Sequence, residues 1–359
     1  MIRRRGAYSG RDKVTVIIAA RNEEKNIGAI LGDLVQQRYS SDLYEVIVAN
    51  DHSTDGTAKV VGAVSRQHAN VRLLNIGNIP PHFSPKKWAI QTAIEKATGD
   101  IILATDADCL VGATWIETML SFFEPDVGVV IGFSEFGAKG EKQNCVESFQ
   151  AFDFVTLMGV AVGSTNLGLP MAASGQNLGY RKSIFQAIGG YERVAHRVSG
   201  DDVLLLQLFR KFTSTKIVFA AHPAAYAVSQ PEPTVKDFIN QRKRWASNGS
   251  IQLSLNFGFF LYLMQVLLFN AALLFGIPAA IITGQHLGTL LICLAARVLL
   301  EFTIALKSAL YFQRTDLLKY FPLWFLVQIP YIVGVGLAGT FGKFRWKERE
   351  HSAHVRESV

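Results

Sequence analysis

Residues 100–108 read DIILATDAD, an apolar run that ends in two carboxylates, Asp106 and Asp108. Runs of the same kind occur at 14–20, 45–49 and 71–75, and patterns typical of helices lie between them at 26–35, 57–66 and 86–97. Near-continuous apolar runs indicate strands buried on both faces, and helical crossovers between such strands imply a parallel sheet. The sequence therefore predicts a doubly wound α/β domain.

Polar residues directly follow three of these predicted strands. They are ARNEE at 20–24, NDHSTDGT at 50–57 and DAD at 106–108. In an open α/β sheet the ligand binds beyond the carboxyl ends of the strands. We therefore expect acidic and amide groups from three strands to gather at one edge of the sheet and to form the ligand site.

Asp106 and Asp108 are suited to a divalent cation. Mg²⁺ and Mn²⁺ prefer oxygen ligands and can share their coordination with phosphate oxygens, so a cation here would neutralise charge on a departing nucleoside diphosphate. The structural alternative is a strand-to-helix turn with a capping carboxylate. The spacing of the two residues does not by itself decide between these interpretations.

Three further side chains near this edge are candidates either for the site or for a structural role. Asp51 lies nearest the end of the second strand and can accept hydrogen bonds from a nucleobase. Asp55 is better placed to cap the helix that begins near Thr57. Lys86 opens a helix and can offset diphosphate charge, or it can be an ordinary solvated lysine.

Two later segments place charged groups just before apolar helices. Asp201 and Asp202 follow a glycine. They can mark an ordinary helix N-terminus, or they can provide a general base that takes a proton from an acceptor hydroxyl. Residues 241–245 read QRKRW and precede a long apolar stretch. A basic segment with a tryptophan is typical of a membrane interface, and the functional alternative is a contact with the substrates.

Taken in order, these segments resemble glycosyltransferase family 2, the inverting GT-A enzymes, over about residues 13–250. The resembling segments are 16–24, 48–57, 86–90, 106–108, 200–202 and 241–245. The last one is similar to the Q-x-x-R-W motif of membrane members such as cellulose, chitin and hyaluronan synthases and ceramide glucosyltransferase. The resemblance implies a GT-A domain in residues 1–250 that uses a nucleotide-sugar donor, with UDP as the expected nucleotide.

The resemblance also implies a role for each matched residue. On the donor side, Asp51 would contact the nucleobase, and Asp106 would contact the diphosphate and the sugar. Asp108 and Asp106 together would bind Mg²⁺ or Mn²⁺. Lys86 and Arg244 would contact the diphosphate. On the acceptor side, Asp202 would be the catalytic base, and Asp201, Gln241 and Trp245 would bind the acceptor. A departure from the family pattern is Ile90, which replaces the usual leucine of the K-x-x-A-L segment.

An excess of apolar residues in the last third of the chain indicates a membrane protein. Hydrophobic residues make up 49% of the 359 residues, and the mean hydropathy is +0.22. Three long apolar stretches occupy 255–283, 287–312 and 320–341. About 20 helical residues cross a bilayer core, so we expect about three transmembrane helices in 251–342, followed by a basic tail at 343–359.

The net charge of +7 favours a membrane surface over nucleic acid. Basic clusters at 3–5, 242–244 and 343–349 flank the apolar parts, and no zinc-ligand spacing or aromatic-basic motif of an RNA-binding module is present. Three scattered cysteines fit a reducing compartment. The basic N-terminus is followed by no apolar segment of the kind found in signal peptides. We expect a multi-pass protein of the cell membrane with a cytoplasmic catalytic domain.

Three spans after a cytoplasmic domain conflict with the charge of the tail. Such a count places residues 343–359 outside, whereas positively charged segments usually stay inside. The stretch 320–341, which contains Pro322 and Pro330, is therefore suspected of being re-entrant. Inside the second stretch, Arg297 and Glu301 lie one helical turn apart and are expected to pair.

The resemblance, taken with the apolar stretches, implies transfer of a hexose to a lipid-linked or membrane-proximal hydroxyl with formation of a β-glycosidic bond. A processive β-glycan synthase is the first alternative, and it would act as a homo-oligomer or with a polysaccharide-export partner. An inactive transferase-like membrane scaffold is the second. A soluble nucleotidyltransferase would also use a doubly wound sheet with paired aspartates, but it would need neither the QRKRW segment nor the apolar helices.

Overall fold

The computed structural model describes residues 10–346 and 349–352, which form two compact units. One, called here the α/β unit, comprises the chain to Ala138 together with Ala161–Gln230; the other, the helical unit, comprises Lys139–Val160 and the chain from Pro231. The basic cluster at 3–5 and residues 347–348 and 353–359 of the tail lie outside the described residues.

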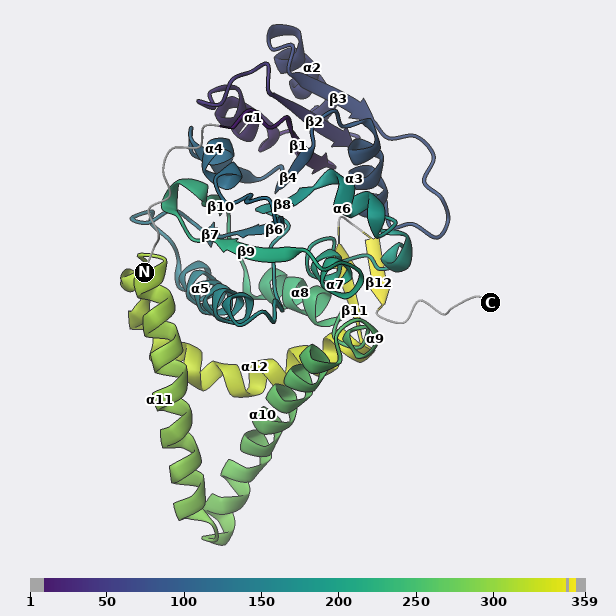
Figure 1. The fold of residues 1–359 in the computed structure, drawn as a ribbon. Helices are drawn as coiled ribbons and strands as arrows, with labels where there is room; N and C mark the ends of the chain where they lie inside the picture. Colours follow the sequence, from purple (N-terminus) through teal and green to yellow (C-terminus); the bar gives the residue numbers. More distant parts are fainter. Residues whose placement is uncertain (1–9, 347–348, 353–359) are drawn as a thin grey trace. The chain divides into compact units, whose positions relative to one another are not determined.

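The α/β unit contains a seven-stranded sheet in the order β3-β2-β1-β4-β8-β6-β9 (Figure 1). Its strands are β1 (Val14–Ala20), β2 (Tyr44–Asn50), β3 (Val71–Asn75), β4 (Ile101–Asp106), β6 (Val127–Gly132), β8 (Leu178–Arg181) and β9 (Lys216–Ala220). All neighbours pair in parallel except β8, which is antiparallel to both β4 and β6. The prediction of a doubly wound, mostly parallel sheet is confirmed.

Strand register brings the polar segments to one edge. Ala20 at the end of β1 pairs with Asn50 at the end of β2, and Ala19 pairs with Asp106 at the end of β4. Because these three central strands are parallel and end level with one another, the residues that follow them emerge side by side. The edge predicted to carry the site is therefore a consequence of strand register.

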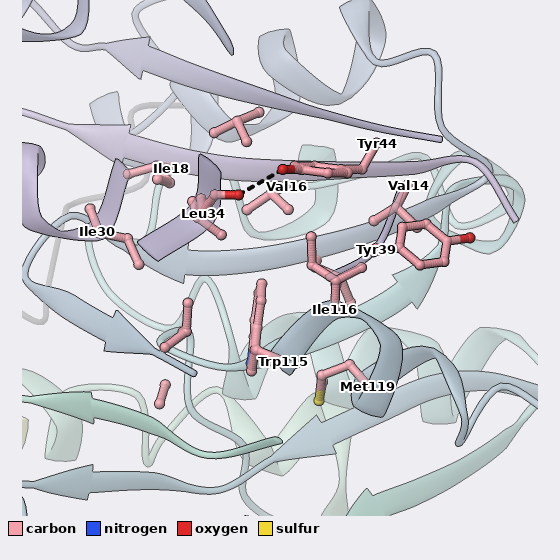
Figure 2. Packing of buried hydrophobic residues seen from close by; sticks show 14 of the residues in the cluster. Val14, Val16, Ile18, Ile30, Leu34, Tyr39, Tyr44, Trp115, Ile116 and Met119 are labelled. Atoms are coloured by element: carbon pink, nitrogen blue, oxygen red, sulfur yellow. Dashed lines mark hydrogen bonds between the residues drawn. The ribbon is translucent and has the colours of Figure 1, made fainter. Parts of the chain in front are cut away.

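Helices pack on the sheet and close its core. They are α1 (Ile27–Val35), α2 (Thr57–Gln67), α3 (Pro85–Lys96), α4 (Trp115–Leu120), α6 (Lys182–Ala187) and α7 (Val203–Phe212). Figure 2 shows the cluster in which Val16 and Ile18 of β1 lie near Ile30 of α1 and Trp115 of α4. The Tyr44 hydroxyl donates a hydrogen bond to the Leu34 carbonyl at 2.8 Å, so the polar atom of this buried ring is satisfied.

Several elements of the α/β unit differ from the sequence-based expectation. Strand β8, which occupies Leu178–Arg181, was not predicted from the sequence. A second, three-stranded sheet of β5 (Cys109–Val111), β10 (Ala227–Ser229) and β7 (Ser134–Phe136) was not predicted. These strands are three or four residues long, too short for the alternation of apolar and polar residues to identify a strand.

The helical unit contains the first part of α5 (Cys145–Asn166), then α8 (Val235–Ala246), α9 (Gln252–Leu255), α10 (Phe257–Thr283), α11 (Leu287–Tyr311) and α12 (Phe321–Phe341). Helices α10 and α11 form a hairpin, and α12 runs across its two arms (Figure 1). The described tail residues form a β-hairpin, β11 (Lys343–Trp346) and β12 (Arg349–Ser352).

Four helices of the described chain are long and apolar enough to cross a membrane, one more than the sequence suggested. The additional helix is α5, but 61% of its most apolar window is buried inside the protein, against 17% for α10 and 11% for α11. The apolar residues of α5 are therefore largely used in protein packing, whereas those of the hairpin are exposed.

Candidate active site

The loops that follow β1 and β2 are held together by side-chain hydrogen bonds to backbone. The Asn22 side chain accepts from the Thr54 amide at 2.8 Å, and Glu24 accepts from the Gly56 amide at 3.0 Å. Asn22 and His52 both have positive φ angles, 55° and 53°. Such left-handed conformations are uncommon outside glycine and turn each loop sharply at the end of its strand.

Asp51 is buried at the end of β2 and lies between two basic side chains. Its carboxylate is 3.7 Å from the Arg21 guanidinium and 3.1 Å from His52 Nδ1. Asp55, in contrast, accepts hydrogen bonds from the amide and hydroxyl of Thr57 at the start of α2. The structural role expected of Asp55 is confirmed, and Asp51 has a carboxylate at the edge where ligands bind.

Lys86 joins the β4 end to the segment before α7. Its ammonium lies 2.9 Å from Asp106 and 2.9 Å from Asp201, and 19%, 27% and 12% of the three side chains are exposed. Burial alone would lower the pKa of Lys86, but the two carboxylates outweigh it and raise that pKa. Burial alone would raise the pKa of Asp201, but Lys86 outweighs it and lowers that pKa. The group is therefore an ammonium shared by two carboxylates.

Lys87, which is fully buried, ties α3 to the same segment. Its ammonium donates to the backbone carbonyls of Arg197 and, at 2.8 Å, of Ser199. Burial lowers the pKa of Lys87 to about 7. The two adjacent lysines at the start of α3 therefore have different surroundings: Lys86 contacts carboxylates and Lys87 contacts backbone.

The Asp202 carboxylate is fixed at the N-terminus of α7. One oxygen accepts from the Val203 amide at 2.6 Å and the other from the Gly175 amide at 2.9 Å. Burial and the neighbouring charge of Asp201 raise the pKa of Asp202. A carboxylate with a raised pKa is a stronger base than an ordinary one, as a group that removes a hydroxyl proton requires.

Asp108 lies in an excess of negative charge. Burial and the charges of Asp106 and Glu23 raise the pKa of Asp108 to about 6. Carboxylates that repel one another in this way have the donor chemistry for a divalent cation. Among the described residues, no three His, Cys, Asp or Glu side chains gather closely enough to hold a metal ion by themselves. The pair fits a cation that takes further ligands from the substrate.

A small cavity adjoins the shared ammonium. Lys86, Asp106, Asp201 and Gly175 contribute to its lining, together with the ring of Tyr191. The structure thus brings Lys86, Asp106, Asp201 and Asp202 into one connected group within the α/β unit.

Gln241, Arg244 and Trp245 belong to the helical unit, on α8. The Gln241 side chain donates to the Glu232 carboxylate at 3.1 Å. The Trp245 ring lies beneath the Arg242 guanidinium, 4.0 Å from the ring centre, and near Phe154. These residues therefore have partners of their own within that unit.

Sequence reasoning missed two groups of contacts at the site. Arg21 and His52 flank Asp51, and both could have been found because they directly follow strands β1 and β2. Gly175 donates to Asp202 from a segment 27 residues earlier, and Lys87 reaches carbonyls more than 100 residues away. No pattern in the sequence indicates these contacts.

A parallel half-sheet, an antiparallel β8 beside β4 and an acidic site at the strand ends together define the GT-A class of nucleotide-sugar-binding folds. Residues 15–189 match the model of Glycosyl transferase family 2. This stretch is a glycosyltransferase family 2 domain, as the segments 16–24, 48–57, 86–90 and 106–108 predicted; the segments 200–202 and 241–245 lie outside the matched residues.

A solved structure with the same fold extends the comparison to most of the chain. The mannosyltransferase PcManGT from Pyrobaculum calidifontis, in complex with GDP-Man and Mn²⁺, is similar with a TM-score of 0.63 and 19% identity. The match covers 93% of this chain and 88% of that one. At this identity the similarity demonstrates the fold.

Curated relatives are also glycosyltransferases. The probable glycosyltransferase YdaM of Bacillus subtilis is 26% identical over 242 residues, which are 65% of this chain and 54% of that protein. The beta-monoglucosyldiacylglycerol synthase of Synechocystis is 28% identical over 111 residues, 31% of this chain and 23% of that protein. This chain therefore spans about half the length of YdaM and less of the synthase.

Proposed function

We propose that the protein is a membrane-anchored inverting hexosyltransferase. It moves a hexose from a nucleotide sugar, in the first place a UDP-sugar, to a lipid-linked or membrane-proximal hydroxyl and forms a β-glycosidic bond. The observation that carries the proposal is the shared ammonium of Lys86, which joins Asp106 at the predicted donor side to Asp201, the neighbour of the predicted base Asp202. A donor sugar and an attacking hydroxyl have to meet at such a place.

On the donor side, we assign recognition of the nucleotide's base to Asp51. We assign contacts with the diphosphate to Lys86, Asp106 and Arg244. Asp106 and Asp108 would hold Mg²⁺ or Mn²⁺, which when bound neutralises negative charge on the leaving diphosphate. The raised pKa of Asp108 supports this assignment because, besides burial, it reflects the nearby negative charges of Asp106 and Glu23, which a bound cation would offset. The Mn²⁺ of the PcManGT complex supports a divalent metal without deciding between the two ions.

On the acceptor side, Asp202 takes the proton of the attacking hydroxyl. The hydroxyl oxygen then bonds to the anomeric carbon as the bond from that carbon to the diphosphate oxygen breaks, so an α-linked donor gives a β product. The amides of Gly175 and Val203 keep the Asp202 carboxylate in one orientation. Asp201, Gln241 and Trp245 are proposed to bind the acceptor, on the basis of the family motifs that they match.

A lipid acceptor is supported by two observations. The hairpin α10–α11 exposes its apolar side chains, as a membrane-embedded segment does. One relative is named for the synthesis of a glucosyl diacylglycerol. We therefore propose a location at the cell membrane, and from the scattered cysteines, which fit a reducing compartment, a catalytic domain in the cytoplasm.

A donor and acceptor screen tests the proposal. Purified protein in detergent is incubated with Mg²⁺ or Mn²⁺, with UDP- and GDP-hexoses in turn, and with total membrane lipid extract, and products are read by mass spectrometry. We expect one donor to give a lipid heavier by one hexose residue. A polymer of many hexoses would favour the processive synthase, and neither turnover nor binding with any donor would favour the scaffold.

A further inference from the structure

The course of α12 bears on how the helical unit sits in a membrane. By length and composition α12 qualifies as a span, like α10 and α11. A spanning helix meets the part of the protein outside the membrane at only one of its ends, because its other end lies about 30 Å away. The contacts of α12 therefore distinguish a spanning helix from one that lies on the surface.

Both ends of α12 contact the polar part of the helical unit. Near its beginning, the Trp324 indole donates to Asp153 of α5 at 2.9 Å. Near its end, Gly339 lies so close to α8 that a Cβ there would be 2.6 Å from that of Ala246. In between, the rings of Tyr331 and Phe238 stack at 5.6 Å. The contacts extend over 15 residues, about 22 Å of helix.

Helix α8 cannot accompany α12 through a hydrocarbon core. Its twelve residues, VKDFINQRKRWA, include four basic side chains and one acidic side chain. A charged side chain near the bilayer centre is strongly unfavourable, and this helix contains five. Because α12 lies lengthwise against this helix, α12 has to lie at the same depth, which is the membrane surface.

The outward face of α12 is nevertheless entirely apolar. Its exposed large side chains are Leu323, Leu326, Val327, Leu337 and Phe341, which recur at intervals of one, three, four and ten residues along one side of the helix. A helix of this kind lies in the interface with its apolar face sunk about 5–10 Å into the boundary between headgroups and acyl chains. The acyl chains therefore cover this face.

The length of the hairpin below α12 agrees with this placement. Gly336 of α12 approaches Leu267 of α10, and α10 continues to Thr283 at the turn. The 16 residues between them span about 24 Å. The hydrocarbon core of a bilayer is about 30 Å thick, and α12 would occupy its outermost 5–10 Å. The hairpin then has about 20–25 Å of the core left to cross. The exposed polar turn at 284–286 then reaches the opposite headgroups.

The charged pair in α11 also lies at the level of α12. Arg297 donates to Glu301 at 2.8 Å and to Gln328 of α12 at 2.9 Å. Between the basic cluster of α8 and Arg297, the sequence contains no Asp, Glu, Lys or Arg. The part of the hairpin that lies beyond α12 thus contains no charged side chain.

We propose that only the hairpin α10–α11 crosses the bilayer, and that α12 lies along the lipid surface on the side of α5 and α8. The chain after α12 is then on the same side of the bilayer as α8. This places the basic residues of 343–349 on the proposed cytoplasmic side, where positively charged segments usually stay. The proposal rests on the membrane location given under the proposed function.

Cysteine labelling of the full chain in sealed membrane vesicles tests the topology. Two variants, Ser358→Cys in the tail and Gln285→Cys in the turn, are treated with a membrane-impermeant maleimide, and labelled peptides are identified by mass spectrometry. The exposed native Cys145 of α5 marks the reference side. We expect Cys145 and the tail site to react from one side and the turn site only from the other. Labelling of the tail from the side of the turn, or of the turn from the side of Cys145, overturns the proposal.

A lysine placed on either helix gives a second, independent measurement. Leu326 of α12 and Phe275 of α10 are similarly exposed, at 68% and 70%. We expect Leu326→Lys to insert as the unchanged protein does, because its ammonium reaches the headgroups, and Phe275→Lys to reduce the inserted amount about tenfold or more. Equal losses in both variants would contradict the surface position of α12. Failure of the unchanged protein to fractionate with membranes would instead contradict the membrane location itself.

Discussion

Two buried ion-pair clusters, one in each unit, use similar chemistry in different ways. In the α/β unit, Lys86 is shared by two carboxylates and all three side chains keep part of their surface exposed. In the helical unit, Arg242 pairs with Asp153 at 2.8 Å, the two side chains are 4% and 14% exposed, and Arg242 lies over the ring of Trp245. The first cluster, called here the open cluster, is accessible to solvent and has a net negative charge. The second, called the closed cluster, is largely shielded from solvent and has one charge of each sign.

The difference indicates which buried charges serve a ligand and which serve the fold. In a one-to-one pair the two charges offset each other, and the second carboxylate oxygen of Asp153 already accepts a hydrogen bond from Trp324, so the pair serves the fold and offers no net charge to a ligand. A cluster with more carboxylates than cations still favours an incoming cation, and its exposed surface gives access. Five changes test this distinction.

Replacing the predicted base should have the largest effect. Asp202→Asn removes the group that accepts the hydroxyl proton but keeps its shape, so we expect turnover to fall about 10²–10⁴-fold. Donor binding, measured by calorimetry, should stay nearly unchanged. Full turnover in this variant would show that Asp202 is not the base.

Breaking the closed cluster should mainly affect stability. Arg242→Met leaves the Asp153 carboxylate buried without its cation, which costs about 3–5 kcal/mol. We expect a markedly lower unfolding temperature in detergent. If the variant unfolded at the temperature of the unchanged protein, the pair would not have the structural role assigned here.

The matching change in the open cluster should mainly affect turnover. Lys86→Met removes a cation directed at the predicted diphosphate site, and loss of one such group typically costs about 10²–10³ in rate. Because its carboxylate partners are partly exposed, we expect a smaller loss of unfolding temperature than for Arg242→Met. The opposite ranking of the two variants in thermal unfolding would invalidate the comparison.

The pH dependence of turnover should report the raised pKa of Asp202. Burial and the charge of Asp201 disfavour the ionised form, so the pKa of Asp202 lies above its ordinary value of 3.8. The base acts when deprotonated, and turnover therefore falls as the pH decreases through that raised pKa. A profile of kcat that stays flat down to the ordinary carboxyl range would contradict this environment.

The smallest effect is expected for a carboxylate whose hydrogen bonds support the start of α2 and the neighbouring loop after β1. Asp55→Ala removes the acceptor for the Thr57 amide at the start of α2, and loss of a cap costs about 1 kcal/mol. Unfolding temperature should fall slightly while turnover per folded molecule is retained. A large loss of turnover would place Asp55 in the donor site with Asp51.

The sequence predicted the part of the fold that depends on local pattern. Strands β1 to β4 and the helices between them are apolar runs with regular periodicity, and parallel pairing then brings Asp51, Asp106 and Asp108 to one edge. Strand β8 escaped prediction because it is four residues long and follows a loop rich in small polar residues. The pattern of apolar and polar residues indicates local secondary structure, but it does not indicate which strand a segment pairs with.

The same limit applies to the site. Lys86 could be proposed from its motif, but the sharing of its ammonium between Asp106 and Asp201 depends on contacts over 20 and 115 positions. Apolar length likewise marked 320–341 as a span, whereas the contacts of α12 with α5 and α8 support a surface position. The hydropathy of a helix indicates that it can contact lipid. Its packing contacts indicate whether it crosses the bilayer or lies on the surface.

The sharing of Lys86 has a consequence for how the two substrates influence one another. A single ammonium cannot hold the donor phosphates and both carboxylates equally well, so an arriving donor would weaken the hold of Lys86 on Asp201. Asp201 would then act on Asp202 as a less neutralised neighbour and increase its affinity for the hydroxyl proton. By thermodynamic reciprocity, protonation of Asp202 would change the affinity for the donor by the same factor. Donor binding and the ionisation of the predicted base would then be coupled although no segment of the chain has to move.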